Sequence, residues 1–380
     1  MDADKISPTA VKGLRIGLVG PLPPPAGGMA NQTRQLGALL QQEGATVELV
    51  QTNPPYPAWI ANFRWVRAPF RLFPYFINLW CVAGKVQLLH VMANSGWSWH
   101  FFAAPAIWVA KLRSIPVVVN YRGGGAEAFF ARSFFLVRPS LRRADAVVVP
   151  SRFLEQVFAK RGIAAGIVPN IIDLARFSRH GAADRVTTDR PPHIVVTRNL
   201  ERIYDIGTAL RAFAIFRLRF PEARLTVAGS GLERERLEAL AAGLGLSDAV
   251  IFTGQLDNAE MANLYRAATI ALNPSRVDNM PISVLESLAS GVPVVSTNVG
   301  GVPHLVQDGQ TALLVQPGSP EPMAEAMGRI AADKILARRL SEAGSAAVQA
   351  YAWANVRDRL VEVYACVTTG AQRAAPADAK

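Results

Sequence analysis

A chain of 380 residues exceeds one ordinary domain and suits two domains of about 150–200 residues each. Half of the residues are hydrophobic and only 18% are charged, which excludes wholesale disorder. The two cysteines, Cys81 and Cys366, exclude a disulfide framework and fit a reducing compartment. The first fifteen residues lack an apolar core and no apolar run reaches 18 residues, so we expect neither a signal peptide nor a membrane-spanning helix.

The net charge of +11 lies in the first half of the chain. Residues 1–170 hold 18 Lys and Arg against 7 Asp and Glu, whereas the other residues hold 22 of each kind. No acid occurs between Glu48 and Glu127, although basic and aromatic residues are frequent there. The basic residues are Arg64, Arg67, Arg71, Lys85, Lys111, Arg113 and Arg122, and the aromatic residues near the first three are Tyr56, Trp59, Phe63, Trp65, Phe70, Phe73, Tyr75, Phe76 and Trp80.

Three interpretations of this basic and aromatic window remain open. It forms an amphipathic helix pair that packs on its own domain, or it contacts an anionic membrane surface, or it binds nucleic acid. The nucleic-acid interpretation rests on basic charge alone, so we expect no nucleic-acid partner.

Strands and helices alternate along the first half of the chain. A loop rich in Gly and Pro, Gly20–Gly28, separates the first strand from a helix with Leu36, Leu39 and Leu40 on one face. The expected strands are Arg15–Val19, Thr46–Val50, Val86–Val91, Pro116–Asn120 and Ala146–Val149.

The alternation restarts after a polar stretch at residues 172–192, which we expect to be a linker. The expected strands of the second half are His193–Thr197, Arg224–Ala228, Val250–Phe252, Thr269–Leu272, Pro293–Ser296 and Ala312–Leu314. We therefore predict two doubly wound α/β domains with parallel sheets at 1–171 and 193–350, a last helix at 351–367 and a disordered tail at 368–380. Such domains face one another across a cleft, where ligands bind at the carboxyl ends of the strands.

The segment from Asn273 to Gly291 carries the strongest sign of a binding site. A strand ends there, a loop contains Asp278, and Pro281 begins a helix whose free N–H groups and dipole suit a phosphate. Glu286 lies at the edge of the apolar stripe of that helix, where sugar hydroxyls would satisfy a half-buried carboxylate. The alternative is that Asp278 caps the helix and Glu286 is solvated.

Two further features are compatible with phosphate binding. Arg198 follows a strand end, and its guanidinium fork suits a diphosphate, although an ordinary surface arginine is the alternative. Gly27 and Gly28 precede a helix and let the backbone approach a phosphate, although such a loop is more often a simple turn. The loop does not match GxGxxG and lacks the P-loop lysine, which disfavours dinucleotide and ATP binding.

Taken together, these segments resemble family-4 glycosyltransferases of the GT-B fold over nearly the full chain. The similar stretches are GPLPPPAGGMANQTRQLGALL, VVVPSRFLEQVFAKRG, IVPNIIDLARF, LTVAGSGLERERLEALA, VIFTGQL and DNMPISVLESLASGVPVVSTNVGGVPHLVQDG. The resemblance is to versions from bacterial exopolysaccharide and lipopolysaccharide assembly. The terminal YAWANVRDRLVEVY resembles the family helix that returns to the first domain.

The resemblance implies a cytoplasmic glycosyltransferase that retains anomeric configuration and uses no metal or other cofactor. Its first domain would receive a lipid-linked or polysaccharide acceptor, at the inner leaflet of the membrane if the membrane interpretation holds, and its second would bind a nucleotide-sugar. The alternatives are a non-catalytic nucleotide-sugar-binding protein and a nucleotide-sugar epimerase on the same fold.

The resemblance also assigns roles to residues. Glu286 would hold the ribose, Asp278 the donor sugar and Arg198 the diphosphate. The residues expected to line the donor site with them are Gly27, Gly28, Gly229, Gly231, Gln255, Leu256, Asn279, Met280 and Pro281. The sequence departs from the family pattern at three positions: Asp278 replaces Glu, Ile203 replaces a lysine so that Arg202 becomes the candidate second cation, and Arg122 replaces a histidine expected to contact the donor sugar or the acceptor.

Overall fold

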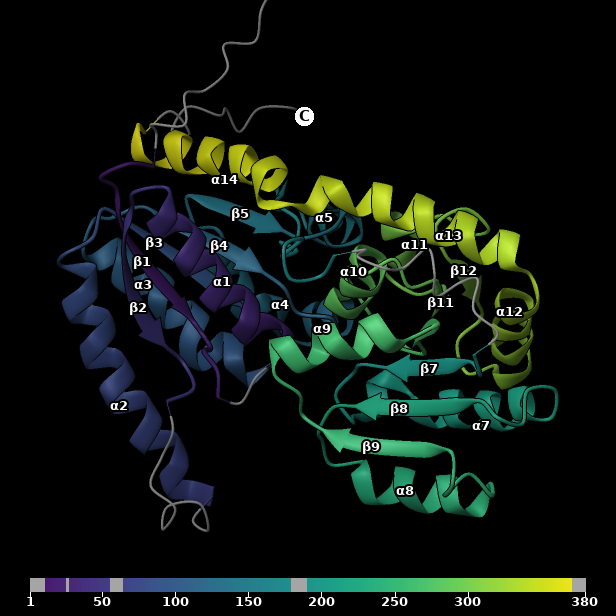
Figure 1. The fold of residues 1–380 in the computed structure, drawn as a ribbon. Helices are drawn as coiled ribbons and strands as arrows, with labels where there is room; N and C mark the ends of the chain where they lie inside the picture. Colours follow the sequence, from purple (N-terminus) through teal and green to yellow (C-terminus); the bar gives the residue numbers. More distant parts are fainter. Residues whose placement is uncertain (1–10, 25–26, 55–63, 179–189, 371–380) are drawn as a thin grey trace, which may run out of the picture. The chain divides into compact units, whose positions relative to one another are not determined.

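The computed structural model describes residues 11–24, 27–54, 64–178 and 190–370, which fold as two compact units (Figure 1). Unit 1 comprises Met1–Ile171 together with Trp353–Lys380, and unit 2 comprises Ile172–Ala352. Residues 172–178 of the expected linker therefore belong to unit 2, while residues 179–189 and the end of the tail, 371–380, lie outside the described residues.

Unit 1 contains a parallel sheet in the order β2-β1-β3-β4-β5-β6. The strands are β1 (Arg15–Gly20), β2 (Thr46–Gln51), β3 (Leu88–Ala93), β4 (Val117–Tyr121), β5 (Ala146–Val149) and β6 (Gly166–Ile167). The helices are α1 (Gly28–Gln42), α2 (Arg64–Ala83), the π-helix η3 (Trp99–Ala103), α3 (Ala104–Leu112), α4 (Ala126–Leu141), α5 (Arg152–Ala159) and α14 (Trp353–Thr368). Helices α1 and α14 pack on one face of the sheet, and α2, α3, α4 and α5 pack on the other.

Helix α14 is the predicted return helix, and a buried hydrogen-bond chain holds it to the sheet. His90 lies in β3, and its ring has a hydrogen-bond partner on each side. Its Nδ1 lies 2.8 Å from the Tyr364 hydroxyl of α14, and its Nε2 lies 3.1 Å from Asn120 Nδ2. Burial, reinforced by the nearby Arg122 charge, lowers the pKa of His90 to about 3, so the ring is neutral. His90 therefore has a structural role, as a neutral link between the sheet and α14.

Unit 2 contains a parallel sheet in the order β12-β11-β10-β7-β8-β9. The strands are β7 (His193–Val196), β8 (Arg224–Ala228), β9 (Val250–Gly254), β10 (Ile270–Asn273), β11 (Val294–Thr297) and β12 (Leu313–Val315). The helices are η4 (Arg202–Tyr204), α7 (Ile206–Arg217), α8 (Arg234–Gly243), α9 (Asn258–Ala267), α10 (Ile282–Ala289), α11 (Val302–Leu305), α12 (Pro320–Ala332), α13 (Lys334–Ala347) and η5 (Val348–Tyr351). Helices α7, α8, α12 and α13 cover one face, and α9, α10 and α11 cover the other.

The structure confirms two parallel α/β sheets with helices on both faces. The strands begin and end within two residues of their predicted positions, but the two-residue edge strand β6 was not predicted because it is too short to show periodicity. Helix α10 begins at Ile282, and Pro281 is the residue before it. Among the described residues, no helix is long and apolar enough to cross a bilayer.

We predict that Tyr364→Phe lowers the free energy of unfolding by about 1–2 kcal/mol, because it removes the partner of a fully buried imidazole nitrogen. Urea denaturation followed by circular dichroism measures this change. An unchanged midpoint would show that the hydrogen bond to His90 does not stabilise the docking of α14.

Candidate functional site

The sheet of unit 2 reverses its strand order between β7 and β10, which are adjacent and parallel. Connections leave these two strands toward opposite faces of the sheet, and ligands of doubly wound proteins commonly bind at the carboxyl ends of the strands at such a switch point. Arg198 follows β7 by two residues, and Asp278 follows β10 by five. The topology therefore brings together two of the predicted site residues, which are 80 positions apart in the sequence.

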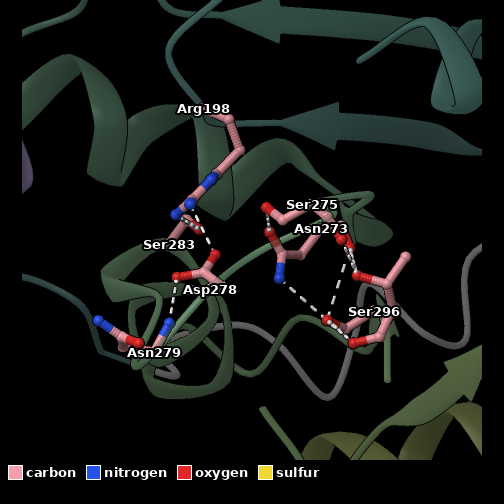
Figure 2. Close-up of polar contacts among 8 residues, drawn as sticks. Arg198, Asn273, Ser275, Asp278, Asn279, Ser283 and Ser296 are labelled. Atoms are coloured by element: carbon pink, nitrogen blue, oxygen red, sulfur yellow. Dashed lines mark hydrogen bonds and ion pairs between the residues drawn. The ribbon is translucent and has the colours of Figure 1, made fainter. Parts of the chain in front are cut away.

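Arg198 and Asp278 form a buried ion pair, with Nη2 of the arginine 2.6 Å from Oδ2 of the aspartate (Figure 2). Their side chains are only 11% and 10% exposed. The guanidinium also donates from Nη1 to Ser283 Oγ at 3.3 Å, and its Cζ lies 4.1 Å from the centre of the Tyr204 ring. Its Nε is buried and has no hydrogen-bond partner among the described residues. One donor of a buried cation is thus left for an acceptor oxygen from a ligand.

A polar network at the ends of β10 and β11 holds the loop that carries Asp278 (Figure 2). Ser275 donates to Asn273 Oδ1 at 2.8 Å, and Asn273 donates to Ser296 Oγ at 3.0 Å. Asp278 Oδ1 accepts the Asn279 N–H at 3.0 Å, and no side-chain hydrogen bond caps α10. Asp278 therefore does not cap the helix. Burial raises its pKa, against the opposing effect of Arg198 and these hydrogen bonds.

Two pairs of glycines permit close backbone contacts around the ion pair. A Cβ atom at Gly300 or Gly301 would overlap the carbonyl oxygen of Asp278 or Asn279 respectively. A Cβ atom at Gly229 would likewise overlap the Arg198 carbonyl oxygen. Gly231 has the same relation to the Leu200 carbonyl oxygen, so the predicted glycines after β8 position the loop of Arg198.

Glu286 is partly buried on α10, and its surroundings favour the protonated, uncharged form of its carboxyl group. Its Oε2 accepts the Tyr265 hydroxyl at 3.2 Å, and that hydroxyl lies 2.6 Å from Thr197 Oγ1. Burial raises the pKa of Glu286 to about 7, and the Tyr265 hydrogen bond and the charges of Arg198 and Arg176 oppose the increase. Glu286 is therefore not a freely solvated carboxylate.

The remaining predicted residues of unit 2 differ in their environments. Asn279, Met280 and Pro281 are buried beside Asp278, and the Met280 side chain belongs to the hydrophobic core. Arg202 is exposed, and its Nε lies 3.9 Å from Glu233 Oε1. Among the ion pairs of the described residues of unit 2, Arg202 therefore pairs with Glu233, whereas Arg198 pairs with Asp278. The residues after β9 are Gln255, which is exposed, and Leu256, which is partly buried.

Unit 1 places its own candidates at strand ends. Gly27 precedes α1 in extended conformation, and no side chain caps this helix, whose first residue is Gly28. Arg122 follows β4 and donates from Nε to Asn120 Oδ1 at 3.1 Å. Its Nη1 donates to Asn170 Oδ1 and to Gln32 Oε1, the latter at 3.4 Å. Burial lowers the pKa of Arg122 to about 10.

Sequence reasoning did not single out Tyr265, Tyr204, Ser283, Gly300 or Gly301. The segments quoted for the family resemblance contain Ser283, Gly300 and Gly301, but no spacing rule connects a tyrosine on α9 with a carboxylate on α10. A groove of about 740 Å³ on unit 2, between α7, α12 and α13, contains none of the predicted site residues. Within the described residues, no group of three or more His, Cys, Asp or Glu is arranged to hold a metal ion.

Two doubly wound parallel α/β units are the architecture of the GT-B fold, and sequence profiles identify the family. The profile "Glycosyl transferases group 1" matches residues 183–347, and the profile "Glycosyltransferase Family 4" matches residues 26–176. The chain belongs to the group 1, family 4 glycosyltransferases.

Individual relatives share parts of the sequence or the fold. A D-inositol 3-phosphate glycosyltransferase of Corynebacterium urealyticum is 33% identical over 177 residues, which are 45% of this chain and 42% of that protein. The chain thus spans about two fifths of the length of such curated relatives.

Two solved structures share the fold. The sucrose-phosphate synthase of Thermosynechococcus elongatus superposes with a TM-score of 0.78 at 23% identity, covering 94% of this chain and 100% of that one. The Anabaena protein HepE in complex with UDP-glucose has a TM-score of 0.72 at 16% identity, covering 92% and 99%.

We predict that Gly301→Ala lowers the free energy of unfolding by about 1–3 kcal/mol, because the added methyl group overlaps a backbone carbonyl that cannot move without displacing the Asp278 loop. Thermal unfolding measures the loss. The control is Gly328→Ala inside α12, where a Cβ meets no atom within 4 Å and alanine favours the helix. Equal effects of the two substitutions would contradict the proposed close contact.

We predict that Glu286→Gln stabilises the protein relative to wild type as the pH increases. The carboxyl pKa rises from 4.5 in the unfolded chain to about 7 in the folded one, so the wild-type chain loses stability as the pH rises from 4.5 through 7. Glutamine does not titrate, and the shift corresponds to at most roughly 3 kcal/mol. Unfolding midpoints at pH 4.5 and pH 8 test this. A constant difference between the two proteins would show that Glu286 has an ordinary pKa.

Proposed function

We propose that this chain is a glycosyltransferase that moves a sugar from a nucleotide-sugar to a lipid-linked or polysaccharide acceptor in the cytoplasm, during assembly of cell-surface glycans. The observation that carries the proposal is the buried Arg198 guanidinium, which presents an unpaired Nε beside two carboxyls whose pKa values are raised by burial. Family membership supports the activity, and the resemblance implies that the anomeric configuration is retained.

Arg198 would bind the diphosphate of the donor. Its Nη2 and Nη1 contact Asp278 and Ser283, its Nε has no hydrogen-bond partner among the described residues, and guanidinium groups bind phosphate oxygens strongly. The first turn of α10, which no side chain caps, adds N–H donors at the same strand end. As the bond between sugar and phosphate breaks, this fixed cation would stabilise the charge that develops on the leaving nucleotide.

The two carboxyls would bind the hydroxyl groups of the donor. Glu286 would accept hydroxyls of the ribose, which satisfy a carboxylate that otherwise has the Tyr265 hydroxyl as its neighbour. Asp278, held by Asn279, would accept hydroxyls of the transferred sugar. The solved UDP-glucose complex of HepE makes UDP-glucose the first donor to test.

Unit 1 would contribute the acceptor side. Arg122, which contacts Asn120, Gln32 and Asn170, would bind a phosphate or carboxylate on the acceptor or contact the donor sugar. Gly27 and Gly28 would allow close approach of either substrate to the N–H groups at the start of α1.

We predict that Glu286→Gln and Asp278→Asn each lower the rate of sugar transfer by about 10²-fold or more, because each replaces a carboxyl group that would bind donor hydroxyls with an amide. Release of UDP and sugar incorporation into lipid extracts are measured together. The matched control is Glu238→Gln, an exposed carboxylate on α8 that pairs with Arg234. Donor binding by calorimetry without any transfer would instead indicate a non-catalytic binding protein, and interconversion of the donor sugar would indicate an epimerase.

We also predict that EDTA leaves the transfer rate unchanged, because Arg198 supplies the cation that the leaving diphosphate needs. Initial rates with and without chelator measure this. Loss of activity that Mg²⁺ or Mn²⁺ restores would show that a metal ion, and not Arg198 alone, balances the charge.

A further inference from the structure

Helix α2 of unit 1 is apolar on two opposite sides. Tyr75, Leu79 and Val82 are buried against the sheet, as expected for a helix that covers it. A second apolar stripe points to solvent at helical spacing and consists of Phe73, Phe76, Ile77 and Trp80, with exposures of 71%, 41%, 52% and 45%. Packing within unit 1 explains the first stripe but not the second.

The neighbouring helices also expose apolar side chains. Helix α3 packs against both α2 and α4, and all three lie on the same face of the sheet. Trp108 and Leu112 of α3 are exposed, as are Phe135 and Leu136 of α4. We call these four residues, together with the stripe on α2, the aromatic face. Exposed large apolar side chains that gather on neighbouring helices of one face are a common mark of interaction surfaces.

The segment that carries the aromatic face is also rich in basic residues. Residues 64–143, which span α2 to α4, contain eleven Lys and Arg and a single acid, Glu127. The Arg113 guanidinium lies 4.0 Å from the centre of the Trp80 ring, and the Arg143 guanidinium lies 4.0 Å from that of Trp108. Four further basic residues of this segment are exposed: Lys85, Arg132, Arg138 and Arg142.

This combination fits one kind of partner. A second copy of the face would bring like charges together, and nucleic acid would leave the aliphatic Ile77, Leu112 and Leu136 without stacking partners. A bilayer accepts aliphatic and aromatic side chains at the level of its headgroups, where anionic lipids also attract Lys and Arg. We propose that the aromatic face docks onto the surface of a membrane that contains anionic lipid. This inference does not depend on sugar transfer.

The test is co-sedimentation of the full chain with vesicles of phosphatidylcholine alone or mixed with phosphatidylglycerol. We expect at least tenfold stronger binding to the mixed vesicles, since each basic residue near an anionic surface changes partition about fivefold. High salt should weaken this binding but should not abolish it, because the insertion of apolar side chains does not depend on charge. Quenching of tryptophan fluorescence by brominated lipid should report that exposed indoles enter the bilayer.

Two double variants separate the face from general surface hydrophobicity. Ile77→Glu with Leu112→Glu should abolish vesicle binding. Leu232→Glu with Ile335→Glu alters side chains that are 99% and 82% exposed on unit 2, and should leave vesicle binding unchanged. Circular dichroism verifies that both variants fold. The quenching of tryptophan fluorescence is measured on the wild-type chain, so it tests the proposal even if a variant does not fold.

Several outcomes would overturn the proposal. Equal binding to neutral and mixed vesicles, or binding to neither, removes the role of anionic lipid. Equal effects of the two double variants remove the role of the aromatic face. Self-association or oligonucleotide binding that the Ile77 and Leu112 substitutions abolish, in a chain that does not bind vesicles, would assign the face to that other partner.

Discussion

The buried ion pair between Arg198 and Asp278 is the interaction on which the candidate site of unit 2 depends. Removing both charges from water costs several kcal/mol per ion, so the pair requires close geometry and further hydrogen bonds. Ser283, the Asn279 N–H and the Tyr204 ring supply these contacts. Close backbone packing at Gly229 and Gly301 then holds the two loops that carry the charges. Strand order, glycine positions and polar contacts therefore together hold the Arg198 guanidinium against the Asp278 carboxylate.

The same burial makes the ligand-free site unfavourable for its carboxyls. Burial raises the pKa of both Asp278 and Glu286, so ionisation of these groups opposes folding at neutral pH. A ligand with many hydroxyl groups and a diphosphate would satisfy the carboxyls and the unpaired Arg198 Nε together. The buried carboxyls thus lower the free energy of unfolding at the place where the proposed donor would need them, and such a cost in stability is common at functional sites.

Unit 1 divides its roles between the two faces of its sheet. On one face, the neutral His90 links β3 to Tyr364 and holds α14, so the end of the chain packs with its beginning. On the other face, α2 to α4 bury one apolar side and expose another, with basic residues around it. The first face contributes to the stability of the unit, while the second is available to a partner.

The sequence by itself determined the two α/β sheets, the strand positions within about two residues and the return helix, because strand and helix periodicity and turn residues are local properties. That the segment from Asp278 to Glu286 binds the donor stays a prediction. The sequence did not show that Asp278 pairs with Arg198, that Tyr265 contacts Glu286, or that Arg202 lies 3.9 Å from Glu233. It also left open whether α2 has one apolar side or two. These features depend on which strand ends meet and which side chains lose water, and only the tertiary structure decides both.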